Sequence, residues 1–316
     1  MDELAEKRRI LISVNPKAGA RDQASLARKL AKSLNYQGFQ AEISSDIEWI
    51  SETAAASWER GELRAVVAAG GDGTVGLIAN RVPAQAPIAV LPLGTENLLS
   101  KYLGLTQDPE RLAEIIATGK TLSLDAGEAN GELFLLMAGC GFDAEVVRRL
   151  HGARTGHINH FSYAKPILDS MRSYEYPELR VYCDDATEPS VTAKWVFVVN
   201  VPRYAGGLQF VPDASSSDGL LDVCTFKQGS FVAGLWYLTG VFMGQHQNLN
   251  DCTTLQASRF RIETDGDVPY QLDGDPGGQL PLEVRVIPQR LRLWVASDWS
   301  EPNASEHQPP ATGPPE

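Results

Sequence analysis

The sequence is poor in cysteine and in positive charge. It contains 4 cysteines in 316 residues, and no two of them form a C-x-x-C pair. This argues against a disulfide framework or a zinc site. Lys and Arg number 28 against 40 Asp and Glu, which gives a formal net charge of −12. We therefore expect no nucleic acid partner, because binding to a phosphate backbone requires a basic face.

Long hydrophobic runs are also missing. The longest apolar stretch, residues 231–243, is shorter than the roughly 20 residues that a membrane-spanning helix needs. The run at residues 10–14 is too short for the core of a signal peptide. We therefore expect a cytoplasmic protein that meets a membrane only at its periphery. Hydrophobic residues make up 43% of the chain, which is enough for ordinary buried cores.

The first third of the chain alternates between strand-like and helix-like segments. Short apolar runs predict strands at residues 9–14, 40–43, 64–69 and 87–91. Helical spacing of apolar residues predicts helices at residues 23–34, 50–58, 75–80, 97–102 and 109–118. This alternation is typical of a doubly wound α/β domain, with a parallel sheet covered by helices on both faces. We assign residues 1–125 to that domain.

Strand-like runs dominate the rest of the chain. They are expected at residues 133–137, 178–183, 193–199, 220–226, 259–263 and 282–286. Their spacing and turn residues predict a larger antiparallel β-sandwich-type domain over residues 126–300, with helices at residues 161–173 and 231–245. Residues 301–316 are rich in Pro, Glu and small polar residues, and we expect a disordered tail there.

The most informative segment is Gly70-Gly71-Asp72-Gly73-Thr74, which directly follows a predicted strand. Glycines let the backbone approach a ligand closely, and a helix beginning here would aim its positive N-terminal dipole at a phosphate. The Asp72 carboxylate suits Mg²⁺ carried with phosphates. The alternative is an ordinary turn in which Asp72 and Thr74 only cap the helix.

Two more loops follow strands at the same edge of the predicted sheet. Residues 15–19 follow the first strand, and residues 92–97 follow the fourth. The carboxyl ends of parallel strands meet at one edge, where doubly wound folds bind nucleotides, so the three loops can converge on one ligand. Residues 139–144 also fit G-x-G-x-x-A, but they lie outside the parallel region and are a weak dinucleotide-binding signal.

The set N-P-x-x-G, G-G-D-G-T and P-x-G-T-x-N resembles the diacylglycerol kinase catalytic family, which includes bacterial lipid kinases and sphingosine kinases. Residues 204–222 resemble that family's G-G to P-x-A to D-G-x-L-D block, and residues 271–278 resemble its D-G-E segment. Read alone, Asp218-Gly219 is a turn signal. The resemblance spans residues 9–295 and implies the two-domain fold of diacylglycerol and NAD kinases.

The resemblance implies an ATP- and Mg²⁺-dependent kinase that phosphorylates a hydroxyl of diacylglycerol or a related lipid, presented at a membrane surface. A homodimer is left open. Asp275 takes the position of the family's catalytic Glu and would accept the proton of the lipid hydroxyl, while Asp72 would help to place Mg²⁺ and the phosphates. A second Mg²⁺ site would use Asp218 and the main-chain carbonyls of Ser215 and Leu220. The implied ATP contacts are Asn15, Pro16, Lys17, Ala18, Gly19, Gly71, Asp72, Gly73, Thr74, Val75, Gly76, Leu77 and Thr95. Ser45 or Asp46, at the end of the second strand, is implied as an additional contact.

Several positions depart from the family pattern. Leu98 stands where the family has Asp, Gly76 and Leu77 where it has Asn and Glu, and Asp275 where it has Glu. A nearby acid, Glu96, is placed to replace the charge lost at Leu98. Two alternatives therefore stay open: an NAD kinase-like enzyme with a soluble acceptor, and a nucleotide- or lipid-binding regulator with weak catalysis.

Overall fold

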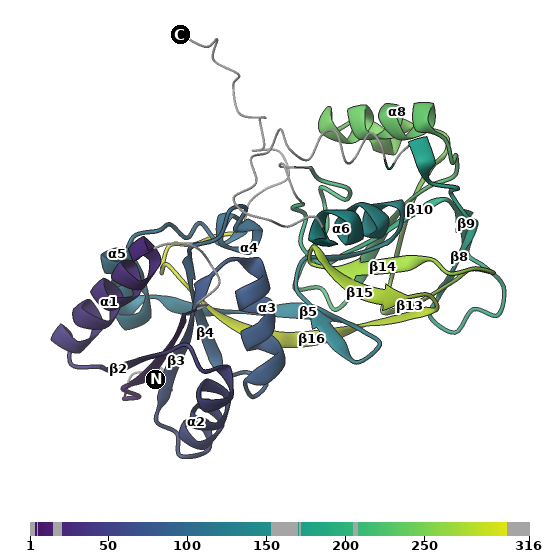
Figure 1. Cartoon of the computed structure of the whole chain (residues 1–316). Helices are drawn as coiled ribbons and strands as arrows, with labels where there is room; N and C mark the ends of the chain where they lie inside the picture. The colour runs from purple at the N-terminus through teal and green to yellow at the C-terminus, as the bar shows by residue number, and fades with distance from the viewer. Residues whose placement is uncertain are drawn as a thin grey trace, which may run out of the picture.

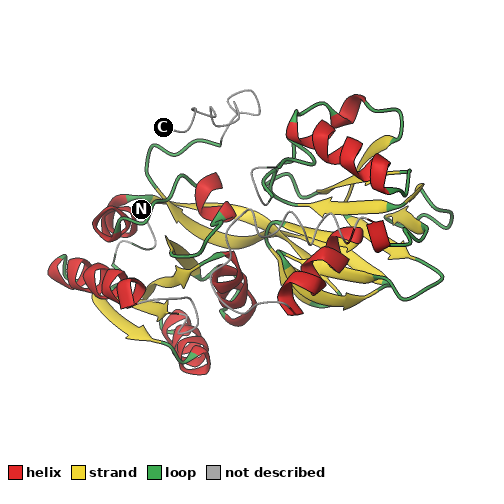
Figure 2. Ribbon diagram, turned by 45° about the horizontal axis from the view of Figure 1, so that its top comes forward, coloured by secondary structure: helices red, strands yellow, loops and turns green. Residues whose placement is uncertain are grey.

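The computed structural model describes residues 4, 6–14, 21–152, 170, 172–204 and 208–301. The chain forms two lobes that lie side by side (Figure 1). Figure 2 shows that strands continue from one lobe into the other, so the two domains share a sheet.

The first domain is built on four parallel strands in the order β2-β1-β3-β4. They are β1 (Arg9–Val14), β2 (Gln40–Ser44), β3 (Leu63–Gly70) and β4 (Pro87–Pro92). Helices α1 (Arg21–Tyr36) and α5 (Pro109–Thr118) cover one face, and α2 (Ile47–Glu59) and α3 (Asp72–Arg81) cover the other (Figure 1). Every residue of β3 and β4 is buried, as expected for central strands with helices on both sides.

The second domain packs two layers of strands against each other. One layer is antiparallel, in the order β12-β11-β10-β7-β14-β15. Its strands are β7 (Met137–Gly141), β10 (Trp195–Val199), β11 (Leu221–Phe226), β12 (Cys252–Ala257), β14 (Pro269–Leu272) and β15 (Asp275–Gln279). The other layer contains β5 (Lys120–Ala129), β6 (Glu132–Phe134), β8 (Leu179–Cys183), β9 (Val191–Ala193), β13 (Arg259–Glu263) and β16 (Leu282–Val295).

Two apolar cores hold the second domain together. Val196 and Val198 from the antiparallel layer meet Phe260 and Ile262 from the other layer. On the outer side of the antiparallel layer, α6 (Phe142–Gly152) and α8 (Phe231–Phe242) cover an aromatic cluster that includes Trp195. The expected fold class is therefore confirmed.

Strand β16 ties the two domains into one sheet. Its first part pairs antiparallel with β13, and Arg292 and Leu293 pair parallel with Pro87 and Ile88 of β4. It also pairs along its length with β5, so residue 125, where we place the domain boundary, lies inside a strand. A register shift between Ile287 and Leu291 interrupts the pairing with β5.

Several elements differ from the prediction. The expected strand at residues 133–137 is two strands, β6 and β7, and β16 extends nine residues beyond the predicted residue 286. The predicted helix at residues 231–245 ends at Phe242, because Gly244 adopts a positive φ of 65° and closes it. Strands β5, β12, β14 and β15 were not predicted. The expected helix at residues 161–173 lies mostly outside the described residues, as does nearly all of the expected tail.

Among the residues that the structure describes, no helix has both the length and the apolar character needed to cross a membrane.

Candidate functional site

The loops that follow β3 and β4 lie against each other at the carboxyl edge of the parallel sheet. A Cβ on Gly94 would stand 2.5 Å from the Cα of Gly71, so both positions need glycine for the backbones to approach this closely. The Leu93 amide donates to the Gly70 carbonyl at 2.9 Å. The structure thus brings together two of the three loops expected here. The third, residues 15–19 with Asn15, Pro16, Lys17, Ala18 and Gly19, lies outside the described residues.

Asp72 joins these two loops through its carboxylate. Its Oδ2 accepts a hydrogen bond from the Leu98 amide at 2.8 Å, and its Oδ1 accepts one from the Leu99 amide at 3.1 Å. Asp72 therefore caps α4 (Leu98–Tyr102), a helix that begins 26 residues later, and α3 itself begins at Asp72 rather than at Val75. Desolvation raises the pKa of Asp72, and the two amides oppose this effect.

The charges around Asp72 are mostly negative. Glu96 also raises the pKa of Asp72, whereas Lys101, which lies 3.8 Å from Glu96, lowers it. Leu98 is buried and contributes no carboxylate to this edge. Glu96 instead supplies negative charge from the preceding turn. Asp72 and Glu96 could contribute oxygen ligands to a cation, but the part of the chain that the structure describes adds no third acidic, His or Cys side chain to them.

The other predicted ATP contacts differ in their exposure to solvent. Thr74 and Val75 are buried, so the structure gives a ligand little access to either residue. Thr95 and Ser45 are exposed, and Ser45 lies at the end of β2 on the same sheet edge. Asp46 caps α2, accepting from the amides of Glu48 and Trp49 at 3.0 and 3.1 Å. Three more of the predicted ATP contacts lie in α3. Gly73 and Leu77 are exposed, and Gly76 is half-buried.

Asp275 reaches this edge from the second domain. It opens β15, directly after a two-residue turn in which Asp273 and Gly274 have φ values of 50° and 89°. A Cβ built on Gly73 would lie 3.4 Å from Oδ2 of Asp275. Two positions about two hundred residues apart in the sequence are therefore neighbours in space.

Asp273 anchors the hairpin that carries Asp275. Its carboxylate accepts the amides of Leu135, Leu136 and Met137 at 2.6, 2.8 and 3.0 Å. Desolvation raises the pKa of Asp273 to about 6, and the nearby Asp72 adds to that effect. The hairpin is thus fixed to the segment that links β6 to β7.

A chain of buried polar groups holds the other side of the turn. The Gly274 amide donates to Oε1 of Gln271 at 2.7 Å, and Nε2 of Gln271 donates to Oδ2 of Asp143 at 2.9 Å. The Tyr204 hydroxyl donates to the other Asp143 oxygen at 2.9 Å. Desolvation raises the pKa of Asp143 to about 6, and these two hydrogen bonds hold it lower than burial alone would.

Sequence reasoning missed the roles of Asp143, Gln271 and Asp273. The available signals were the first acid of the D-G-D turn, which is Asp273, and the glycine at residue 139. A Cβ on Gly139 would overlap the Asp143 carboxylate, so this glycine makes room for the buried acid. Strand β7, which contains Gly139, pairs antiparallel with both of its neighbours. The G-x-G-x-x-A segment therefore does not form a dinucleotide-binding turn.

The loop at residues 215–220 concentrates acid in the second domain. Asp218 accepts from the Leu220 amide at 3.0 Å and from Gln256 at 3.1 Å. Burial, followed by the charges of Asp218 and Asp213, raises the pKa of Asp222 to about 6. Like charges held together in this way fit a cation. No three acidic, His or Cys side chains of the described residues gather as a complete metal cage, so a cation here would also need backbone carbonyls such as those of Ser215 and Leu220.

Asp125 braces that loop, a role that the sequence did not indicate. Its two oxygens accept the amides of Gly219 and Gln289, each at 2.7 Å. Gln289 lies at the interruption in β16, so one buried carboxylate connects the acidic loop to the strand shared by both domains.

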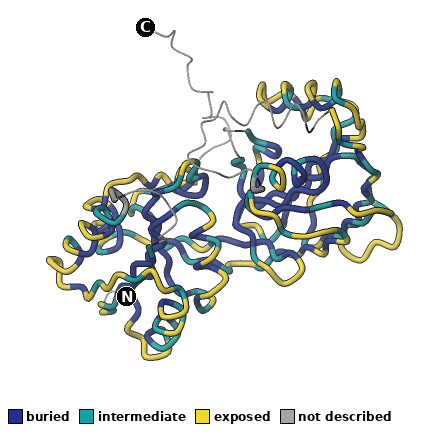
Figure 3. The backbone as a smooth tube through the Cα atoms, in the orientation of Figure 1, coloured by how far each residue is buried: buried dark blue, intermediate teal, exposed yellow. Residues whose placement is uncertain are grey.

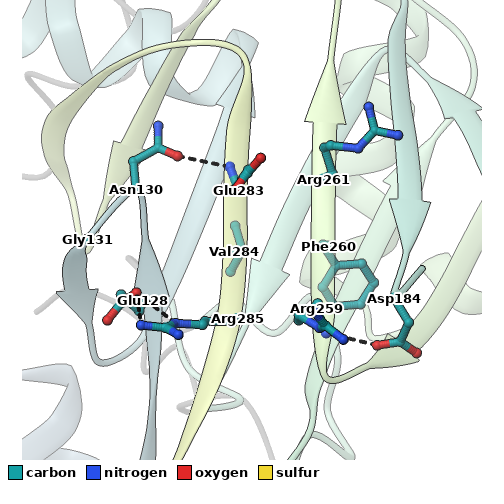
Figure 4. Close-up of a pocket in the computed structure, with 10 residues that line it drawn as sticks. All are labelled: Glu128, Asn130, Gly131, Asp184, Arg259, Phe260, Arg261, Glu283, Val284 and Arg285. Atoms are coloured by element: carbon teal, nitrogen blue, oxygen red, sulfur yellow. Dashed lines mark hydrogen bonds and ion pairs between the residues drawn. The ribbon is translucent and has the colours of Figure 1, made fainter. Parts of the chain in front are cut away.

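A hollow of about 510 Å³ lies on the outer face of β5, β16 and β13 (Figure 4). Arg285 of β16 forms an ion pair with Glu128 of β5 at 2.7 Å, and Asp184 accepts the backbone amide of Arg259 at 3.1 Å. None of its lining residues belongs to the glycine loops or to the Asp275 hairpin. We therefore place the candidate site at the junction of Gly73 and Asp275.

Comparisons with known proteins cover nearly the whole chain. Residues 9–129 match the diacylglycerol kinase catalytic domain, and residues 137–295 match the YegS C-terminal NAD kinase beta sandwich-like domain. A diacylglycerol kinase from Mycobacterium tuberculosis is 30% identical over 239 residues, covering 72% of this chain and 76% of the relative. One from Bacillus subtilis is 24% identical over 245 residues, covering 76% and 80%.

Solved structures share the fold. A crystal structure of a diacylglycerol kinase from Bacillus anthracis aligns with a TM-score of 0.65 at 21% identity, covering 92% of this chain and 97% of that one. An NAD kinase from Archaeoglobus fulgidus in complex with ATP aligns with a TM-score of 0.50 at 10% identity, covering 92% and 94%.

Proposed function

The chain belongs to the diacylglycerol kinase catalytic family and is a lipid kinase, and we propose that it transfers the γ-phosphate of ATP to a hydroxyl of diacylglycerol or a related lipid. One observation carries the proposal: Asp275 stands beside Gly73. This proximity supports the proposal, because Asp275 could then act as proton acceptor next to the loop that resembles the family's phosphate-binding segment.

In the proposed reaction the lipid hydroxyl oxygen forms a bond to the γ-phosphorus, the bond from that phosphorus to the bridging oxygen of ADP breaks, and Asp275 takes the hydroxyl proton. The first domain, residues 1–125, would hold ATP through the glycine loops, and residues 126–300 would hold the lipid. Gly73 would bring the nucleotide-binding loop against this carboxylate, because a Cβ built on Gly73 lies 3.4 Å from Oδ2 of Asp275.

Asp72 would act mainly by ordering the site. Both of its oxygens already accept amides from α4, so it fixes the loop at residues 92–97 against the loop at residues 70–74. Mg²⁺ bound with the phosphates would neutralise the charge that develops during transfer. Asp72 and Glu96 are placed to attract that ion, and Asp218, with the carbonyls of Ser215 and Leu220, would hold the second one.

The test is phosphate transfer by the purified full chain, with ATP and Mg²⁺, to a panel of lipids and to NAD. We expect labelled phosphate on diacylglycerol or a relative and none on NAD. Transfer to NAD alone would favour a soluble acceptor, and ATP binding without transfer to any member of the panel would defeat the proposal.

A further inference from the structure

We propose that one exposed face of α8 docks the protein on the surface of a lipid bilayer. The proposal rests on the proposed function, because a lipid acceptor resides in a bilayer and the enzyme must reach it there. The face consists of Val232, Leu235, Trp236, Phe242 and Met243, and we call it the α8 apolar face.

The α8 apolar face has regular helical spacing. Its members lie at residue 232, then three and four residues later at 235 and 236, and then seven residues after each of these at 242 and 243, so they share one side of the helix. They are 49 to 75% exposed, whereas Gly234, Tyr237 and Val241 on the opposite side are buried against the domain. Figure 3 shows the exposed positions recurring along α8. The helix is therefore apolar on both sides, although only one side is covered by protein.

This surface is unusual for the molecule. Its five side chains are more than half of the nine large apolar side chains that are exposed among the described residues. A cluster of this kind marks an interaction surface more often than scattered exposure does. The one polar side chain in the same stripe, Thr239, donates its hydroxyl to the Leu235 carbonyl at 2.8 Å, so it does not make the face polar.

The charge pattern points to a bilayer as the occupant. Residues 228–250 contain no Asp, Glu, Lys or Arg, in a chain whose formal net charge is −12. The flanking Lys227 is exposed, and the Arg172 guanidinium lies 5.0 Å from the Phe231 ring. The face thus lacks the acids that would repel anionic headgroups, and it presents a Trp, which is favoured at membrane interfaces.

The position of α8 suits this role. In Figure 1 it lies along the upper edge of the second domain, on the same side as α4, which follows the second glycine loop. With 12 residues, α8 is far shorter than the roughly 20 that span a bilayer, so it would lie in the interface plane. Docking by this face would hold the second domain against the membrane.

The experiment uses the full chain and phosphatidylcholine vesicles that contain diacylglycerol. Trp236→Asp is compared with Tyr36→Asp, a matched change at a side chain that is 93% exposed on α1 of the first domain. We expect Trp236→Asp to weaken vesicle binding by about tenfold or more, because a buried large apolar side chain is worth at least that factor in partition. Tyr36→Asp should bind vesicles as the wild type does. Phe242→Asp should repeat the loss, and unchanged melting temperatures would show that the variants fold.

Activity separates this proposal from the proposed function. Trp236→Asp should lose transfer to vesicle-borne diacylglycerol and keep transfer to a short-chain, water-soluble diacylglycerol. If the wild type binds vesicles through α8 but phosphorylates neither lipid, the proposed function fails and the docking face stands. If Trp236→Asp and Phe242→Asp bind vesicles as strongly as the wild type, the docking proposal is wrong. It is also wrong if light scattering shows that these variants change from dimer to monomer while their vesicle binding is unchanged.

Discussion

The two sides of the candidate site hold their carboxylates in different ways. Asp72, on the first domain, gives both oxygens to backbone amides of the neighbouring loop. Asp275, on the second domain, stands at the tip of a hairpin whose place is set by Asp143, Gln271 and Asp273. The first carboxylate orders a loop, and the second lies beside Gly73 of the first glycine loop. Under the proposed function, the first side would bind the nucleotide and the second would supply the base.

Removing the Asp275 carboxylate should cause the largest loss of activity. We expect Asp275→Ala to lower the rate of phosphate transfer by on the order of 10²–10⁴-fold, because that is the usual contribution of a general base. ATP binding, measured by calorimetry, should change little, since the first domain would hold the nucleotide. Asp275→Glu is the matched control, because it restores the family's side chain and should retain activity. A rate for Asp275→Ala equal to that of the wild type would refute the assignment of the base.

Loosening the hairpin should cost less. We expect Gln271→Leu to lower kcat by on the order of 10²-fold with the KM for ATP unchanged, because a base displaced by about 1 Å loses roughly that factor. Gln271 is fully buried, so protein stability is measured alongside the kinetics. Gln279→Leu, at the exposed far end of β15, is the control and should be neutral. A variant that is less stable but fully active would show that Gln271 supports the fold and not the base.

The binding side can be tested through its glycines. Gly94→Ala should lower the free energy of unfolding by about 1–3 kcal/mol, because the added Cβ would push against the Gly71 backbone. Gly76→Ala is the matched change in open space inside α3, and it should raise that free energy by roughly 0.5–1 kcal/mol. Denaturant titration measures both. Equal stability of the two variants would show that the loops do not pack as described.

A further expected effect is a change in the pH dependence of stability. The pKa of Asp143 is about 6 in the folded protein, above the ordinary value near 3.9, so the folded state binds this proton more tightly than the unfolded state. Its contribution to stability is therefore present below about pH 4 and is lost as the pH rises through about 6. Between these pH values Asp143 should make the free energy of unfolding of the wild type fall by up to about 1.4 kcal/mol per pH unit, which corresponds to one proton. We expect Asp143→Asn to remove this contribution to the slope. Parallel stability curves for wild type and variant would contradict this origin of the raised pKa.

Local signals predicted the first domain well. The helix predicted at residues 109–118 is observed as α5 with the same bounds, because Asp108 caps it, Pro109 begins it and Gly119 ends it. The strand at residues 9–14 was also predicted with the observed bounds, since its apolar run is continuous. In such segments the residues that form an element also mark its ends.

The second domain was harder to predict, because its strands are defined by their partners. Strand β15 has the sequence D-P-G-G-Q, which carries no strand propensity, yet it pairs with β14 through a two-residue turn. The later part of β16 was missed because Pro288 and Gln289 interrupt its apolar pattern. Strand β5 contains Gly127, a residue type that usually indicates a turn. Here a Cβ would overlap the Phe134 ring, so the glycine makes room for that ring inside a strand.

The sequence by itself determined the family, the parallel sheet and the glycine loops, because each depends on residues that are close together in the chain. It also singled out Asp275 through its resemblance to a known segment. Only the tertiary structure decided that Asp275 meets Gly73, that Asp72 caps α4 and that α8 leaves an apolar face uncovered. These outcomes depend on sheet register and on which surfaces pack together, and no local spacing of residues encodes the approach of segments two hundred residues apart.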